Sequence, residues 1–95
     1  TGEYDKHFET GIYNCADCGI ALFESDSKFD SGCGWPAFSN ESENANIKQL
    51  IDTSHGMKRI EVRCSNCDSH LGHLFHEARG PRYCINSICL EFQGE

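Results

Sequence analysis

The chain lacks the features that mark several large classes of protein. Its 95 residues include only two prolines, no apolar run long enough to cross a membrane, and no excess of basic side chains. The formal net charge of −7 repels phosphate backbones and anionic lipid surfaces, so we expect neither nucleic-acid nor membrane binding. No signal peptide is visible, and the start at Thr1 leaves room for a trimmed N-terminus. We expect a cytoplasmic monomer.

The pattern of short segments predicts a mainly β protein with little helix. A length of 95 residues fits one domain, 1–95, and nine scattered glycines indicate many short elements. Period-two alternation is clearest over 57–63, as in a half-buried strand: Lys58, Ile60 and Val62 interleave with Met57, Arg59, Glu61 and Arg63. Residues 40–49 are polar and predict a loop or a short helix. The other β-like runs are 11–14, 21–24, 73–76 and 82–92, the last with Ile88, Leu90 and Phe92 expected on one face.

Seven cysteines offer a way to staple so short a chain, but an odd number cannot form a fully paired disulfide framework. Four of them form two matching C-x-x-C pairs, Cys15–Cys18 and Cys64–Cys67. Such knuckles point two thiolates at one ion, and two knuckles complete a closed tetrahedral shell, so we predict a structural zinc site. Gly19 follows the first knuckle, where the turn often needs a positive φ. Iron, two local redox pairs and disulfides between the knuckles remain alternatives.

The other three cysteines differ in their local context. Cys84 follows Arg82 by two positions, so a strand would place a cation on its side and favour the nucleophilic thiolate. Asn86, two positions further, would be within reach of the sulfur or of a substrate. Cys33 lies between two glycines, which suits an exposed thiol that resolves an oxidised partner. Burial as small apolar side chains is the alternative for both cysteines, and it is the expectation for Cys89.

Two histidines and the single tryptophan complete the candidate site. His70 and His73 follow the second knuckle, and imidazoles are the usual proton donors near neutral pH. A second metal pair or a surface position would also explain them. Trp35 follows the glycine-flanked cysteine, where an indole forms either an apolar pocket wall or part of the core.

These residues lie in segments that resemble the methionine-R-sulfoxide reductases of B type, also called the SelR domain. The resemblance covers nearly the whole chain, in the family's order, through TGEYDKHF (1–8), GIYNC (11–15), KFDSGCGWPAF (28–38), DTSHGM (52–57), EVRC (61–64), HLGHLF (70–75) and RYCINS (82–87).

The resemblance implies two packed antiparallel β-sheets in a barrel-like arrangement, with the zinc site remote from the active site. It implies an oxidoreductase that repairs oxidised proteins by reducing the R epimer of methionine sulfoxide, peptide-bound or free. Cys84 corresponds to the catalytic cysteine and Cys33 to the resolving one, with thioredoxin reducing the disulfide between them. His70, His73, Arg82 and Asn86 correspond to the polar side of the pocket, and Trp35 and Phe75 to its apolar side.

The sequence departs from the family pattern in two places. We expect the family's usual N-terminal extension to be missing, and the 76–81 loop is short, with Glu77 expected to take the substrate-binding role of a family aspartate. A binding module built on zinc knuckles is the main rival function, and the presence of both Cys84 and Cys33 counts against it. A disulfide-stapled extracellular domain fits poorly with two matched knuckles.

Overall fold

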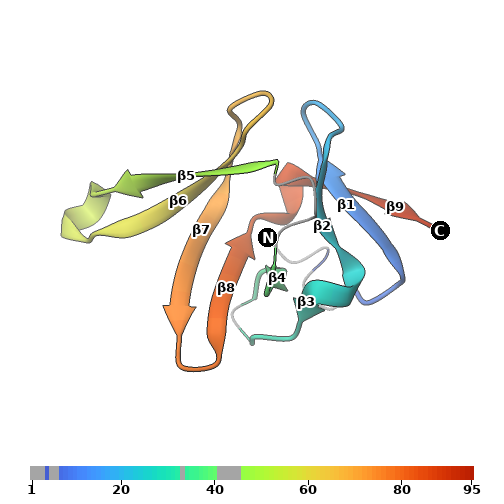
Figure 1. The fold of residues 1–95 in the computed structure, drawn as a ribbon, viewed down its shortest axis with the longest axis horizontal. Helices are drawn as coiled ribbons and strands as arrows, with labels where there is room; N and C mark the ends of the chain where they lie inside the picture. The colour runs from blue at the N-terminus through green and yellow to red at the C-terminus, as the bar shows by residue number, and fades with distance from the viewer. Residues whose placement is uncertain (1–3, 5–6, 33, 41–45) are drawn as a thin grey trace.

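The structure, a computed structural model, describes Tyr4 and residues 7–32, 34–40 and 46–95. These residues form two antiparallel sheets (Figure 1). The smaller sheet has the order β2 (Ala21–Glu24), β1 (Gly11–Cys15), β9 (Leu90–Gly94). The larger has the order β3 (Lys28–Phe29), β4 (Ala37–Phe38), β8 (Gly80–Ile85), β7 (His70–Glu77), β6 (Arg59–Cys64), β5 (Ile47–Asp52). Three short 3-10 helices, η1 (Ser25–Ser27), η2 (Ser54–Gly56) and η3 (Ser87–Cys89), join them.

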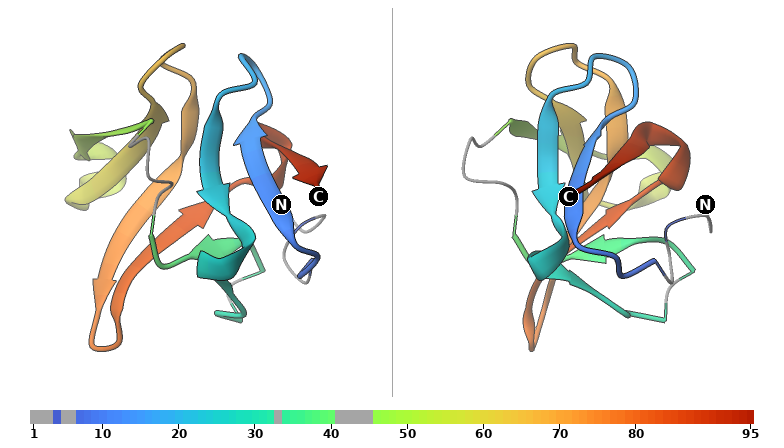
Figure 2. Two further views of the ribbon diagram at one scale, coloured as in Figure 1. Left: turned by 45° about the vertical axis from the view of Figure 1, so that its right-hand side comes forward. Right: turned by 90° about the vertical axis from the view of Figure 1, so that its right-hand side faces the viewer.

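The two sheets pack face to face through a core rich in aromatic side chains (Figure 2). Phe23 of the smaller sheet stacks on Phe38 of the larger one, with ring centroids 4.3 Å apart, and Tyr13 meets the same Phe38 edge-on at 5.1 Å. All three side chains are fully buried, so truncating any one to alanine would cost about 3–5 kcal/mol of stability. The mainly β fold with two packed antiparallel sheets is therefore as expected. No helix in the described part of the chain is both long and apolar enough to cross a membrane.

Alternation along the strands gives the larger sheet two distinct faces. On β8, Tyr83 and Ile85 are buried in the core, whereas Arg82 and Cys84 on the opposite face are partly exposed. β6 behaves in the same way and confirms the half-buried strand expected near 58–63. One face of this sheet thus holds the core, and the other is open and polar.

The expectation of one β-like run over 82–92 is wrong. The chain leaves the larger sheet after Ile85 and enters the smaller one at Leu90, and η3 turns it between them. The Asn86 side chain caps this turn by accepting a hydrogen bond from the Ile88 N–H, 3.2 Å away. Ile88 is therefore 76% exposed and does not share a buried face with Leu90 and Phe92.

The polar stretch 40–49 also differs from the expectation of a loop or helix. Residues 41–45 lie outside the described part of the chain, but Ile47–Asp52 form the strand β5. β5 lies at an edge of the larger sheet, and all its residues are partly or fully exposed. A strand this exposed shows little apolar periodicity, which explains why sequence reasoning missed it.

Candidate active site and metal site

The open face of the larger sheet brings the predicted site residues of β7 and β8 into two rows with polar residues of β5 and β6. Residues directly opposite in antiparallel strands share a face, with Cβ atoms about 4.5–5.5 Å apart. Cys84 lies opposite His73, and His73 lies opposite Glu61. In the neighbouring row, Arg82 lies opposite Phe75, and Asp52 lies opposite Arg59 at the outer edge.

A cavity of about 320 Å³ opens between these rows. Five predicted site residues line it together with one that was not predicted, Arg59; the full set is Trp35, Arg59, His73, Phe75, Arg82 and Cys84. Two aromatic side chains, one imidazole, two guanidinium groups and one thiol therefore meet in a space suited to a single side chain. This is a mixed apolar and polar pocket of the kind that binds small groups.

Close contact between β7 and β8 fixes the position of Cys84. Gly72 precedes His73 on β7, and a Cβ on Gly72 would lie 2.0 Å from the carbonyl oxygen of Cys84. Only glycine permits this approach, and the approach brings the backbone of β8 against β7 beside the thiol. On its other side Cys84 lies opposite Ala37 of β4, and the Ile85 N–H donates to the Pro36 carbonyl over 3.0 Å. Trp35 is thereby held at the cavity.

His73 is oriented by a carboxylate. Its Nε2 atom lies 2.8 Å from Oδ2 of Asp52, and the two side chains are 16% and 19% exposed. The hydrogen bond with His73, followed by one from the Ser54 N–H, holds the pKa of the Asp52 carboxyl well below its usual range. Asp52 is therefore ionised at neutral pH and holds the imidazole beside the cavity through a charge-assisted hydrogen bond.

Arg59 connects this pair to the cavity. Its Nη2 atom donates to Asp52 Oδ2 at 3.3 Å, and its guanidinium group lines the cavity. The Nε atom is buried without a hydrogen-bond partner among the described residues. An unpaired buried N–H is costly, so this donor is available to an oxygen atom of a bound molecule.

His70 lies close to His73 but outside the cavity lining. Its Nδ1 atom is 2.7 Å from Glu61 Oε2, and the two imidazole rings are 5.6 Å apart. A spacing of three would place the two histidines on opposite faces of a regular strand. The register shift between Val62 and Arg63, with Leu71 as the extra residue, brings both to the open face.

The Glu61 carboxyl is held by an arginine and a histidine side chain. It accepts from Arg63 Nε at 2.9 Å as well as contacting His70. Burial raises the pKa of the Glu61 carboxyl, but the hydrogen bonds from Arg63 and His70 outweigh burial, so the net shift is downward. Glu61 therefore carries a negative charge next to the histidine pair.

Glu77 contacts a residue that lines the cavity, and Asn86 follows the strand of Cys84, but neither lines the cavity itself. The Arg82 Nε atom donates to Glu77 Oε2 at 3.0 Å, and the Arg82 guanidinium lies 4.6 Å from the centroid of the Phe75 ring. Arg82 is thus held from two sides, by charge and by a cation–π contact. Asn86 caps η3 immediately after the strand that carries Cys84.

Cys33 lies outside the described residues. Its neighbours Gly32 and Gly34 have φ values of +75° and +84°, a conformation that glycine adopts without strain. Arg79, in the β7–β8 turn, lies 3.6 Å from the centroid of the Phe29 ring, so the turn contacts the strand that precedes this loop.

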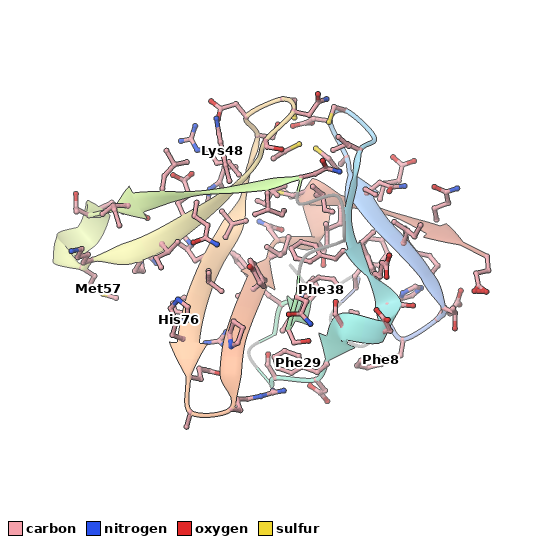
Figure 3. The ribbon with its side chains drawn as sticks, viewed as in Figure 1. Phe8, Phe29, Phe38, Lys48, Met57 and His76 are labelled. Atoms are coloured by element: carbon pink, nitrogen blue, oxygen red, sulfur yellow. The ribbon has the colours of Figure 1, made fainter. Side chains whose placement is uncertain are left out.

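The four knuckle cysteines form a second cluster, between the β1–β2 turn and the β6–β7 turn (Figures 1 and 3). Their sulfur atoms all lie within 4.8 Å of one another, and the Cys15–Cys67 and Cys18–Cys64 pairs are 3.6 Å apart. Tetrahedral zinc with bonds of about 2.3 Å needs sulfur atoms roughly 3.8 Å apart, so the tetrad fits such an ion. None of these cysteines lines the cavity at Cys84.

The two knuckles have the same backbone geometry. The Gly19 N–H donates to the Cys15 carbonyl and the Asp68 N–H to the Cys64 carbonyl, both over 2.8 Å. Gly19 has φ +82°, as expected, and Asp68 takes the equivalent place at φ +67°. Aspartate tolerates this conformation better than most residues, and ion pairs with Lys48 and Arg63 hold its carboxylate.

The pKa values of three tetrad thiols differ with the surroundings of each cysteine. Burial raises the pKa of the Cys15 thiol to about 12, and burial also raises the pKa of Cys64. In contrast, a hydrogen bond from the Asn66 side chain and one from the Ile20 N–H lower the pKa of Cys18 to about 6. Metal binding requires thiolates, and a divalent ion would supply the charge that keeps the two buried sulfurs deprotonated.

Sequence reasoning missed Asp52, Arg59 and Glu61 as parts of the site. The segment 52–57 was noted as a motif, but without strand β5 nothing indicated that its aspartate would lie opposite Arg59 and against His73. The alternating charges at 59, 61 and 63 were the available signal, because charges on one strand face at this density require partners.

The site pairs a half-buried thiol with an imidazole that a carboxylate holds in place. This arrangement is typical of enzymes that use a cysteine nucleophile, and it favours an enzyme over a binding module.

A family model of the SelR domain matches residues 1–94. The chain is 55% identical over 98 residues to a probable methionine-R-sulfoxide reductase B of Caenorhabditis elegans, with 98% of this chain and 64% of the relative covered. It is 54% identical over 96 residues to a peptide methionine sulfoxide reductase MsrB of Chromohalobacter salexigens, covering 97% and 72% of the two chains.

The chain therefore belongs to the SelR domain family, with methionine-R-sulfoxide reductases of B type as its relatives. It spans just under two thirds of the length of the nematode relative. The crystal structure of the Mis18 "Yippee-like" domain has the same fold, with a TM-score of 0.73, 14% identity, and 92% and 98% of the two chains covered.

Proposed function

We propose that this chain, acting as one domain over 1–95, reduces the R epimer of methionine sulfoxide to methionine, with Cys84 as the nucleophile. The observation that carries the proposal is the placement of Cys84 opposite His73 in a cavity walled by Trp35 and Phe75. The aromatic walls suit the methyl group of the substrate, and the polar side suits its oxygen. Family membership supports the same reaction.

The chemistry can be written with the residues at the cavity. The Cys84 thiolate attacks the sulfoxide sulfur while His73, protonated and held by Asp52, gives a proton to the oxygen. Methionine leaves, and the oxygen remains in net terms as a sulfenic acid on Cys84, so the thiol is oxidised by two electrons. Arg82 next to the cavity favours the thiolate, and the unpaired Nε of Arg59 donates to a substrate oxygen.

The remaining predicted residues support these groups. We assign His70, paired with Glu61, to the proton supply of the histidine pair, and Glu77 to the positioning of Arg82. Asn86 fixes the turn that ends the strand of the nucleophile. These roles are positioning roles, because none of the three lines the cavity.

Recycling requires a second thiol and an external reductant. We propose that the Cys33 thiol condenses with the Cys84 sulfenic acid, releasing water and forming a disulfide, and that thioredoxin reduces this disulfide by exchange. We further propose zinc as the metal of the cysteine tetrad, a monomeric enzyme and a cytoplasmic location. The zinc ion would be structural, because its four thiolate ligands leave no open position.

Epimer-resolved turnover tests the function directly. With dithiothreitol as reductant, the purified chain should reduce a peptide carrying methionine-R-sulfoxide and leave the S epimer unchanged, because the aromatic and polar walls accept only one arrangement of methyl group and oxygen. Chromatographic separation of the epimers measures both rates in one sample. Equal reduction of the two epimers, or no reduction of either, would contradict the proposal.

The Asp52–His73 pair makes a second prediction. Asp52→Asn keeps the shape of the side chain but removes its charge, so the His73 imidazole loses its charged hydrogen-bond partner. We expect kcat/KM to fall by about 10- to 100-fold, because the proton donor is no longer held firmly at the cavity. Asp26→Asn, at an exposed position in η1, is the matched control and should behave as the wild type. Unchanged kcat/KM in Asp52→Asn would contradict a positioning role for Asp52.

A further inference from the structure

The only methionine of the chain stands at the outer end of the β5–β6 hairpin. Met57 follows η2 and is 56% exposed, and Figure 3 shows it at the far-left tip of the hairpin, to one side of β7 and β8. A thioether in this position is open to small oxidants, because nothing covers most of its surface. Oxidation there costs no core packing, so the fold would tolerate the sulfoxide.

Hydrogen bonds at the point where the two strands meet the loop hold the tip in one conformation. Arg59 Nη2 donates to Asp52 Oδ2 at 3.3 Å and to Ser54 Oγ at 3.5 Å, and the Ser54 N–H donates to Asp52 Oδ1 at 2.9 Å. The Met57 N–H closes the turn by donating to the Ser54 carbonyl at 3.3 Å. Met57 therefore lies on a fixed, protruding loop that points away from β8, the strand that carries Cys84 of the same chain (Figure 3).

We infer that Met57 is an oxidation site of this protein and that its R-sulfoxide is a substrate for the cavity of a second copy. The inference rests on the proposed function for the reduction step. Hydrogen peroxide transfers one oxygen to the Met57 sulfur and leaves as water. The Cys84 thiol of another copy then takes the oxygen, giving methionine and a sulfenic acid. Dithiothreitol reduces the sulfenic acid back to the thiol, with release of water and formation of oxidised, cyclic dithiothreitol.

Two features make the hairpin tip suitable for this exchange between copies. The cavity lies on the open face of the larger sheet and accommodates about one side chain, so a donor residue must protrude from its own protein. Met57 protrudes, and its neighbours in the loop, residues 53, 54, 56 and 58, are also exposed. The chain thus carries both the reactive site and one substrate for it.

The experiment separates substrate from catalyst. The Cys84→Ser variant is oxidised with hydrogen peroxide, treated with dithiothreitol to restore its thiols, and used as substrate. The Met57→Leu variant, which keeps Cys84, is the catalyst, and a short methionine-R-sulfoxide peptide in the same tube is the tracer. Mass spectrometry of the tryptic segment 49–58 then reports the sulfoxide at Met57. The double variant Cys84→Ser, Met57→Leu is the inactive matched control.

We expect peroxide to oxidise Met57, and the catalyst to remove about half of that sulfoxide, because peroxide gives both epimers and an enzyme of this type reduces one. The inactive control should remove none. If the tracer is reduced while the Met57 sulfoxide persists, the inference is overturned and the proposed function stands. If neither is reduced, both fail. Failure of peroxide to oxidise Met57 while it oxidises a free methionine peptide would also overturn the inference.

Discussion

Cys84→Ser is expected to abolish reduction of methionine sulfoxide, lowering kcat by about 1,000-fold or more, while leaving the fold intact. A serine hydroxyl stays protonated near neutral pH and does not attack the sulfoxide sulfur, so the remaining site binds substrate without consuming it. Cys84 is partly exposed and its side chain lies on the open face, so a smaller isosteric oxygen leaves the core untouched. Turnover with dithiothreitol and the melting temperature, measured on the same preparation, check both halves of this expectation.

Cys33→Ser is the matched control for this experiment, because it removes a thiol without touching the nucleophile. A single turnover should survive in Cys33→Ser, and cycling with thioredoxin should be lost, since the sulfenic acid then has no internal partner. Full turnover in Cys84→Ser would rule out the proposed nucleophile. Unchanged thioredoxin cycling in Cys33→Ser would instead point to Cys89 or to direct reduction of the sulfenic acid.

Loss of the metal is expected to have the largest effect on stability. The tetrad ties Cys15 of the smaller sheet to Cys64 of the larger one, and both are buried. Structural zinc contributes roughly 10–16 kcal/mol in zinc-finger peptides, which matches or exceeds the total stability of about 5–15 kcal/mol typical of a domain. Removal of the ion with a strong chelator, or Cys15→Ser, should therefore leave the chain largely unfolded at 25 °C.

Elemental analysis and circular dichroism test this together. The purified chain should contain close to one zinc ion, and chelation should remove the ion and the β signal in parallel. Cys89→Ser, a change to a half-buried cysteine outside the tetrad, should keep both the ion and the fold. A chain that stays folded with an unchanged melting temperature after complete metal removal would contradict a structural role, and iron in place of zinc would correct the identity of the ion.

The elements that could be predicted were those with strong local signals. The two C-x-x-C knuckles placed four cysteines in one cluster, and the alternation near 58–63 gave a half-buried strand. In contrast, β5 has no buried face, and the break between Ile85 and Leu90 depends on which sheet accepts the next strand. Neither fact is encoded by periodicity, because both arise from long-range pairing.

The same distinction holds for the site. The neighbours of Cys84 on its own strand could be anticipated from period-two spacing, and Arg82 does share its face. The partners of His73 could not, since Asp52 comes from another hairpin and meets the imidazole only through register. The face that His70 occupies depends on a bulge at Leu71, and bulges leave little trace in a single sequence.

The division of the larger sheet into two faces sets how this chain can change without harm. Along β8, the effects of substitutions should alternate from one residue to the next. Changes at Tyr83 and Ile85 would reduce the amount of soluble protein, whereas changes at Arg82 and Cys84 would leave the yield unchanged and remove catalysis. Neighbouring residues of β8 are therefore constrained by different requirements, one by folding and the next by catalysis. Substitutions on the open face of the strand can therefore change substrate preference without altering the packing of the core on the other face.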